Sequence, residues 1–163
     1  YGKLRVNATE AEIGKYANNV FGYIKVIYGN ILADMAHGLT EKFKKDGIAT
    51  KVSYENIAEL LGHDKRVGMS YLKVNHGNYC GAGGYCFPKD MTAFIKFNQK
   101  LIADLKKAKR IDKGLIKSLE AGLKVLKSVE DYNIQLLKWQ GLSLDEVSHH
   151  NNHLQTQPKK IRC

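Results

Sequence analysis

Residues 9–38, TEAEIGKYANNVFGYIKVIYGNILADMAHG, predict one long helix that would form the spine of the fold. Thr9 and Glu12 have the spacing of a capping box, which marks the start of a helix. Apolar residues then recur at intervals of three and four, and no proline occurs before Gly38. We therefore expect a helix of roughly 28 residues, or about 42 Å at 1.5 Å per residue.

Gly14, Gly22 and Gly29 all lie inside this predicted helix. In a helix interior each glycine costs about 1 kcal/mol relative to alanine. We expect close packing against another helix, of the same subunit or of a neighbouring one, to explain why they are tolerated.

The rest of the chain also has helical patterns, and no segment predicts a convincing strand. Ser53 precedes a second periodic stretch, and Pro88 stands where the first turn of another helix would begin. The stretch MSYLKV, residues 69–74, is compatible with a short strand or an extended loop. We predict an all-α helical bundle built on one long central helix, with further helices over residues 41–45, 54–61, 88–107 and 115–141 and a short helix and polar tail over 142–163.

The composition excludes a membrane-spanning protein and indicates an anionic partner or a solvated basic surface. The chain has 26 lysines and arginines and 16 acidic residues, which gives a net charge of +10. Such a charge attracts nucleic acid, anionic membranes or phosphorylated small molecules. The alternative is that the basic residues only form the solvated surface of helices. No apolar run approaches the roughly 18 residues of a membrane helix, and the first residues do not form a signal peptide. Three cysteines are too few for a disulfide framework, so we expect free thiols and a cytoplasmic protein.

Residues 81–90, GAGGYCFPKD, place Cys86 between a glycine-rich loop and the start of a helix. A helix N-terminus and the neighbouring Lys89 favour a reactive thiolate, and Asp90 in the first turn could position a water or shuttle a proton. From the residues alone, three other interpretations stay open: a disulfide with Cys80, part of a zinc site, or a buried structural cysteine. Zinc needs about four ligands, and only His76 could join the two thiols.

Glu12, Lys15 and Asn19 fall on one face of the predicted first helix. Lysine and asparagine both donate hydrogen bonds, so this face could stabilise a developing oxyanion. The alternative is a surface pair between Glu12 and Lys15, which would contribute roughly a few tenths of a kcal/mol.

Three motifs follow one another along the chain: Ala11-Glu12-x-x-Lys15-Tyr16-x-x-Asn19, Gly62-x-Asp64-x-Arg66-Val67-Gly68 and Gly83-Gly84-Tyr85-Cys86-Phe87-Pro88-Lys89-Asp90. Together they resemble the central domain of the UDP-glucose/GDP-mannose dehydrogenase family, and the last motif favours the branch that acts on UDP-glucose. The resemblance covers residues 8–97 and, more weakly, 125–137. It implies a fold like the C-terminal domain of 6-phosphogluconate dehydrogenase and a homodimer formed through the long first helix.

In this family two successive NAD-dependent hydride transfers convert the C6 alcohol of a nucleotide sugar into a carboxylate. The resemblance implies that Cys86 attacks the intermediate aldehyde to give a thiohemiacetal, which is oxidised to a thioester and hydrolysed. Lys15 and Asn19 would hold the oxyanion, Asp90 would position or activate water, and Glu12 would support them. The residues implied in substrate binding are Arg66, often contributed by the neighbouring subunit, and Gly83, Gly84, Phe87 and Lys89.

The chain departs from the family pattern in three places. The segment from Arg66 to Cys86, which contains Cys80, and the lysine-rich stretch 100–125 both look longer than in typical members. No G-x-G-x-x-G fingerprint follows a strand, so we expect NAD to be bound by a domain outside this chain. We therefore expect the chain alone to be inactive, and we expect no metal site even at His149, His150 and His153.

We predict three segments: residues 1–107 as the central domain with its catalytic loop, 108–141 as a long helix leading toward a C-terminal domain, and 142–163 as a short helix and polar tail. The predicted function is the dimerisation and catalytic-cysteine part of an oxidoreductase that acts on a UDP-sugar. It would bind neither membrane nor nucleic acid. The alternative is a non-enzymatic basic helical module that binds nucleic acid or a partner protein, with Cys86 incidental.

Overall fold

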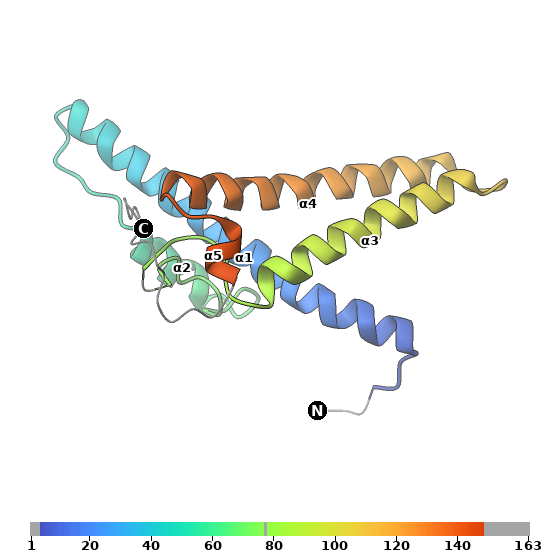
Figure 1. Ribbon diagram of the computed structural model, residues 1–163. Helices are drawn as coiled ribbons and strands as arrows, with labels where there is room; N and C mark the ends of the chain where they lie inside the picture. Colours follow the sequence, from blue (N-terminus) through green and yellow to red (C-terminus); the bar gives the residue numbers. More distant parts are fainter. Residues whose placement is uncertain (1–3, 77, 149–163) are drawn as a thin grey trace.

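The computed structural model describes residues 4–76 and 78–148, and these ranges contain five α-helices (Figure 1). Their bounds are α1 Ala8–Lys45, α2 Tyr54–His63, α3 Phe87–Lys107, α4 Lys113–Trp139 and α5 Leu144–Ser148. No strand forms in these ranges, where one isolated antiparallel bridge joins Asn75 to Cys80. The prediction of an all-α fold is therefore confirmed, and residues 69–74 are an irregular loop. The histidines of the polar tail and Cys163 lie outside the described residues.

Helix α1 is longer than predicted, with 38 residues, or about 57 Å. The side chain of its N-cap, Asn7, accepts a hydrogen bond from the Glu10 N–H, and the Glu10 carboxylate accepts one from the Asn7 N–H. The capping box predicted at Thr9 is therefore wrong by two residues, because Asn7 supplies the same chemistry earlier. Gly38 does not end the helix, which continues through the segment 41–45 that was predicted as a separate helix.

The ends of the shorter helices follow local signals more closely. Ser53 caps α2 as predicted, by accepting a hydrogen bond from the Asn56 N–H. Gly62 lies inside α2 and does not stop it; Met69 occupies the space where a side chain of residue 62 would lie. Helix α3 begins with Pro88 in its first turn and ends at Lys107, both as predicted. Single residues, Ser53 and Pro88, thus locate the starts of these two helices.

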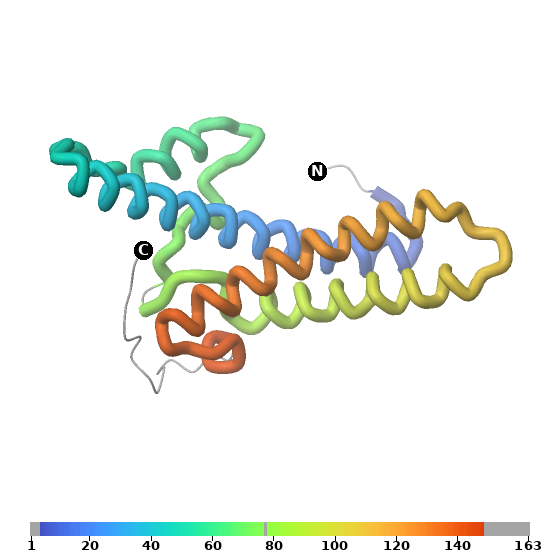
Figure 2. The backbone as a smooth tube through the Cα atoms, turned by 90° about the horizontal axis from the view of Figure 1, so that it is seen from above, coloured from blue at the N-terminus to red at the C-terminus, as the bar shows by residue number. Residues whose placement is uncertain are grey.

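The core follows α1. Helices α3 and α4 form an antiparallel hairpin that packs against the middle of α1, while α2 lies beside its C-terminal half (Figures 1 and 2). One core cluster, which includes Tyr23, Ile27 and Met91, lies where α1 meets the hairpin. A second cluster, which includes Leu72 and Val74, joins α1 to α2 and to the following loop. The single long helix therefore connects two separate apolar cores.

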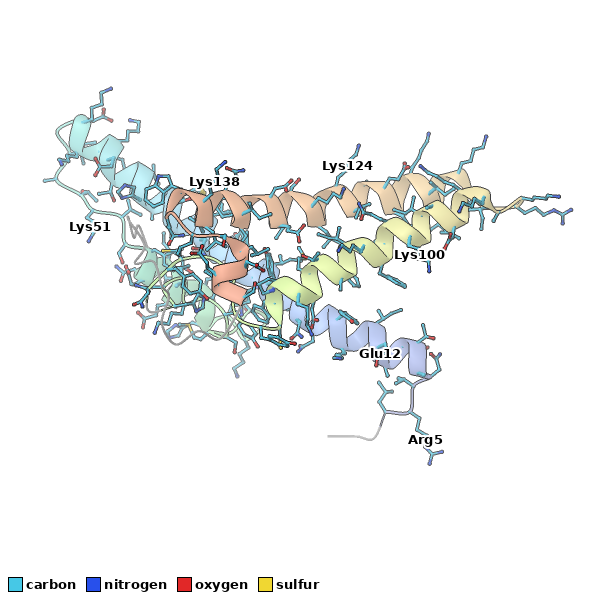
Figure 3. The ribbon with its side chains drawn as sticks, in the orientation of Figure 1. Arg5, Glu12, Lys51, Lys100, Lys124 and Lys138 are labelled. Carbon is cyan, nitrogen blue, oxygen red and sulfur yellow. The ribbon has the colours of Figure 1, made fainter. Side chains whose placement is uncertain are left out.

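The lysine-rich stretch forms the projecting part of the α3–α4 hairpin. Lys100 and Lys124 extend from its outer surface into solvent (Figure 3). An ion pair of 2.6 Å between Lys106 and Glu120 links the two helices near the tip. In the ranges that the structure describes, none of the helices is both long and apolar enough to cross a membrane.

Two glycines of α1 stand where other parts of the chain approach it closely. A β-carbon at Gly22 would lie 2.6 Å from the Phe87 ring, and one at Gly29 would lie 2.6 Å from the Tyr54 hydroxyl. Close packing therefore explains both glycines, but the approaching atoms belong to side chains at the starts of α3 and α2. At Gly14 no atom lies within 4 Å of the equivalent position.

We expect Gly22→Ala to destabilise the chain by about 1 to 3 kcal/mol, because the added β-carbon would overlap the Phe87 ring. Gly14→Ala is the matched control on the same helix. It should stabilise the chain by up to about 1 kcal/mol, because alanine favours the helix and the space is open. Urea unfolding measures both free energies, and equal effects at the two positions would contradict the close contact at Gly22.

Candidate active site

Cys86 is an exposed free thiol at the N-terminus of α3. It occupies the N-cap position, its side chain caps no backbone N–H, and the helix begins at the next residue, Phe87. Because Cys86 is free, the disulfide with Cys80 is excluded, and so is a buried structural role. Cys80 itself is buried and disulfide-bonded, so the expectation of free thiols is wrong for this residue. The described part of the chain has no group of three metal-ligating side chains that could hold a metal ion.

One helical turn after the thiol lies a buried carboxylate. Asp90 is only 2% exposed, and its N–H donates to the Cys86 carbonyl oxygen over 2.9 Å. Its Oδ2 accepts a hydrogen bond from Nδ2 of Asn19 on α1 at 2.5 Å. A carboxylate this buried requires such partners, because losing its hydration is otherwise costly. The structure therefore brings together three of the predicted catalytic residues, from segments 71 positions apart in the chain.

The exposed Lys89 supplies the positive charge of this cluster. Its ammonium lies 3.3 Å from Oδ1 of Asp90 and 5.2 Å from the centre of the Tyr85 ring. The hydrogen bond to Asp90 and the charge of that carboxylate raise the pKa of Lys89, and the nearby Cys86 and Tyr85 add to the increase. Lys89 is thus held beside the Asp90 carboxylate at the start of α3, near the Cys86 thiol.

Lys15 and Glu12 lie further along α1, on the N-terminal side of Asn19 (Figure 3 labels Glu12). The Lys15 ammonium lies 5.7 Å from the centre of the Tyr16 ring, and no ion pair between Lys15 and Glu12 forms in the described residues. Lys15 is exposed and precedes Asn19 by one helical turn. It therefore flanks the cluster without a contact to Asp90.

An apolar groove of about 420 Å³ lies between the N-terminal part of α1 and α3. Glu12 stands at its edge, and its other lining residues are mostly apolar or aromatic: Ala8, Thr9, Ile13, Tyr16, Ala93, Phe94 and Phe97. Glu12 thus borders the groove and does not contact the thiol cluster directly.

Three of the residues implied in substrate binding already have contacts within the chain. The Gly84 N–H donates to the Val147 carbonyl oxygen over 2.7 Å, and Phe87 packs against the core and edge-on to Tyr71, with ring centres 5.2 Å apart. A β-carbon at Gly83 would overlap the Tyr79 hydroxyl. No acceptor for the Gly83 N–H is found among the described residues.

Arg66 lies on the turn after α2 and has Asp64 as its side-chain partner. Its side chain is 88% exposed and forms a two-pronged ion pair with Asp64, with the shortest contact at 2.6 Å. Lys25 of α1 anchors this turn by donating to the carbonyl oxygens of Val67 and Gly68 at 2.7 and 2.8 Å. The turn is thus fixed on α1, while the guanidinium faces outward.

Sequence reasoning missed two amides that hold the cysteine loop. Asn133 and Gln140 are both completely buried and bond to the backbone of Ala82 and Cys80. A signal for Asn133 exists, because it stands four residues from Val129 and from Leu137 on the apolar face of α4. A polar residue in that position requires a buried partner.

The arrangement combines an exposed thiol at a helix N-terminus with a buried carboxylate held one turn later. The thiol lies at the N-terminus of α3, and the Lys89 ammonium lies three residues later, beside Asp90. Cysteine acts as a nucleophile in its thiolate form. A carboxylate near such a nucleophile can position or activate water for hydrolysis of a covalent adduct. The geometry therefore suits covalent catalysis by Cys86.

We expect Asn19→Ala to destabilise the chain by about 1 to 3 kcal/mol, because it leaves the buried Asp90 carboxylate without its amide donor. Asn18→Ala is the matched control: Asn18 is exposed, and its change should stay within about 0.5 kcal/mol. Since both substitutions replace asparagine by alanine in one helix, the difference in unfolding free energy isolates the bond to Asp90. Equal unfolding free energies for the two variants would show that the bond between Asn19 and Asp90 does not stabilise the chain.

Comparisons with known proteins identify the family of this chain. A profile of the central domain of the UDP-glucose/GDP-mannose dehydrogenase family matches residues 9–113, which is more than half of the chain. No solved structure gives a significant match.

Several curated relatives are bacterial or archaeal proteins named UDP-glucose 6-dehydrogenase. The relative from Pseudomonas aeruginosa is 33% identical over 57% of this chain and 17% of its own length. The relative AglM from Haloferax volcanii is 35% identical over 56% of this chain and 18% of its own. The relative from Rickettsia typhi is 30% identical over 71% of this chain and 22% of its own. The chain thus spans about a fifth of the length of these relatives. Because the family profile matches more than half of the chain, including the residues of the thiol cluster, the chain belongs to the UDP-glucose/GDP-mannose dehydrogenase family.

Proposed function

We propose that this chain is the central part of a UDP-glucose 6-dehydrogenase and that it supplies the cysteine nucleophile and the dimer interface of that enzyme. The observation that carries the proposal is the free, exposed Cys86 one turn before the buried Asp90, which Asn19 holds in place. The names of the relatives supply the substrate class, a UDP-sugar. On this proposal the enzyme oxidises UDP-glucose to UDP-glucuronate.

Cys86 provides the covalent step of the proposed reaction. Its sulfur attacks the C6 aldehyde and forms a carbon–sulfur bond, and the carbonyl oxygen becomes the oxyanion of a thiohemiacetal. Lys15, which is exposed and one turn from Asn19, supplies a positive charge for that oxyanion when the substrate is bound. After oxidation of this adduct to a thioester, water cleaves the carbon–sulfur bond and releases the carboxylic acid and the thiol.

Asp90 serves the hydrolytic step. It is fixed by the Asn19 amide and the Lys89 ammonium, and it lies one helical turn after the thiol. A carboxylate held in this way positions the attacking water and accepts its proton. Because the Asn19 amide is bonded to Asp90 in this structure, Asn19 acts first by holding that carboxylate.

NAD, the proposed hydride acceptor, does not fit the residues of this chain. The described ranges are helical with irregular connections, and the sequence has no glycine-rich dinucleotide fingerprint after a strand. We propose that another domain of the enzyme binds NAD and supplies the oxidising step.

The proposed dimer forms through α1. Side chains at alternating spacings of three and four residues make one exposed or half-buried apolar strip on this helix: Ala17, Phe21, Ile24, Tyr28, Ile31 and Met35. Phe21, Tyr28 and Met35 are 66%, 51% and 58% exposed. Gly14 and Gly38 extend the strip at either end, with open space where their side chains would lie. This is the spacing with which two helices pack along a common seam.

The nucleophile assignment predicts the behaviour of Cys86→Ser. In the complete enzyme this variant should form no UDP-glucuronate, because a serine hydroxyl is a far weaker nucleophile than a thiolate. Product analysis and NADH absorbance measure the loss, and an unchanged unfolding temperature shows that the variant is folded. The 163-residue chain alone should reduce no NAD with UDP-glucose. Wild-type activity in Cys86→Ser would overturn the assignment.

The dimer assignment predicts that a charge on the α1 strip separates the subunits. Phe21→Glu and Tyr28→Glu should each convert a dimer to a monomer, because burying an unpaired carboxylate in an apolar seam is costly. Leu60→Glu is the control, since Leu60 is 78% exposed on α2 and lies off the strip. Sedimentation equilibrium gives the masses. A wild-type monomer, or dimeric variants, would refute this interface.

A further inference from the structure

Two side-chain amides of α4 and its C-cap hold the loop that leads to Cys86. The Ala82 N–H donates to Oδ1 of Asn133 over 2.8 Å, and Nδ2 of Asn133 donates to the Ala82 carbonyl oxygen over 2.9 Å. Gln140 forms the same pair of bonds with Cys80, at 2.8 and 3.0 Å. Both amides have no exposed surface. Each amide therefore bonds both the N–H and the C=O of one loop residue, as a neighbouring β-strand would do.

The bonds fall on alternate residues of the loop. After Cys80 and Ala82, the Gly84 N–H donates to the carbonyl oxygen of Val147 on α5 over 2.7 Å. We name these five bonds, from Asn133, Gln140 and Val147 to Cys80, Ala82 and Gly84, the loop clamp. It fixes the backbone up to two residues before Cys86.

Gly81 shows how closely the loop lies against α4. A β-carbon there would lie 2.6 Å from Oδ1 of Asn133, and the Gly81 φ is +107°, where other residues are strained. The amide of Asn133 can reach the backbone of Ala82 because the preceding residue has no side chain.

Cys86 therefore has a fixed backbone on both sides. The loop clamp holds the chain before it, and after it α3 is held on α1 by the contact of Phe87 with Gly22 and by the bond of Asp90 with Asn19. Asn133, Gln140 and Val147 all lie beyond residues 9–113, the part that matches the family profile. The position of the thiol thus depends on helices outside the matched region.

We propose that Asn133 and Gln140 are positioning residues for Cys86, which keep its thiol in register with Asp90 during the reaction. The catalytic part of this inference rests on the proposed function, whereas the clamp itself does not. Proximity explains the expected effect, since a misplacement of about 1 Å can reduce a rate about 100-fold.

Hydrogen exchange in the 163-residue chain tests the clamp without any assay of activity. Asn133→Leu should speed exchange of the Ala82 amide, and Gln140→Met that of the Cys80 amide, each by about tenfold or more relative to wild type. Asn30→Leu is the control, because Asn30 is an equally buried amide that bonds only within α1, to the Val26 carbonyl oxygen. It should leave both loop amides slow. Unchanged exchange at Ala82 and Cys80 in the clamp variants would overturn the proposal.

Steady-state kinetics of the complete enzyme test the positioning role. Both clamp variants should lower kcat by about 10- to 100-fold and leave the KM for NAD nearly unchanged. The control, Asn30→Leu, should leave both kcat and KM unchanged. If Asn133→Leu does not fold, Gln140→Met still tests the positioning role, because Gln140 bonds to a different loop residue, Cys80. Faster exchange with wild-type kcat would refute positioning and leave the proposed function intact. Full activity of Cys86→Ser would instead refute the proposed function, while the exchange result would still report on the clamp.

Discussion

The missing side chain at Gly22 lets the ring of Phe87 pack directly on α1, and much of the candidate site depends on that contact. Phe87 is the first residue of α3 and follows Cys86 immediately, so seating its ring on α1 also seats the start of α3 there. Asn19 lies just under one helical turn before Gly22, and it reaches the carboxylate of Asp90 across the same helix pair. The packing of Phe87 on Gly22 thus brings α1 and α3 close enough for the hydrogen bond between Asn19 and Asp90 to form.

The site is assembled from three parts of the chain that are held by different forces. Apolar packing joins α1 to α3, a buried hydrogen bond joins Asn19 to Asp90, and two buried amides join α4 to the cysteine loop. A loop rich in glycine has few side chains to pack and loses much conformational entropy when it is ordered. The amides of Asn133 and Gln140 compensate by satisfying its backbone directly. A nucleophile can then occupy one place on an otherwise flexible loop.

Local sequence patterns predicted the helices well, but they did not predict which face of a helix is buried in the core. The interval of threes and fours in α1 correctly indicated a helix, yet its apolar residues serve two faces. Val20 and Ile27 are buried in the core, whereas Phe21 and Met35 remain exposed. Periodicity records that a side chain is apolar, and it carries no information on which neighbour will cover it. The helix start was displaced for a similar reason, because both Asn7 and Thr9 can cap and only the tertiary position of the chain selects one.

Spacings within a few turns of the chain are enough to predict the helical class, the position of Cys86 at the start of a helix and the grouping of Lys15 with Asn19 on one helical face. The contact of Asn19 with Asp90 and the bonds from α4 to the cysteine loop emerge only in the folded structure. Both join residues far apart in the chain, and such pairs depend on how helices cross. The crossing is set by volumes at contact points such as Gly22, which no local spacing encodes.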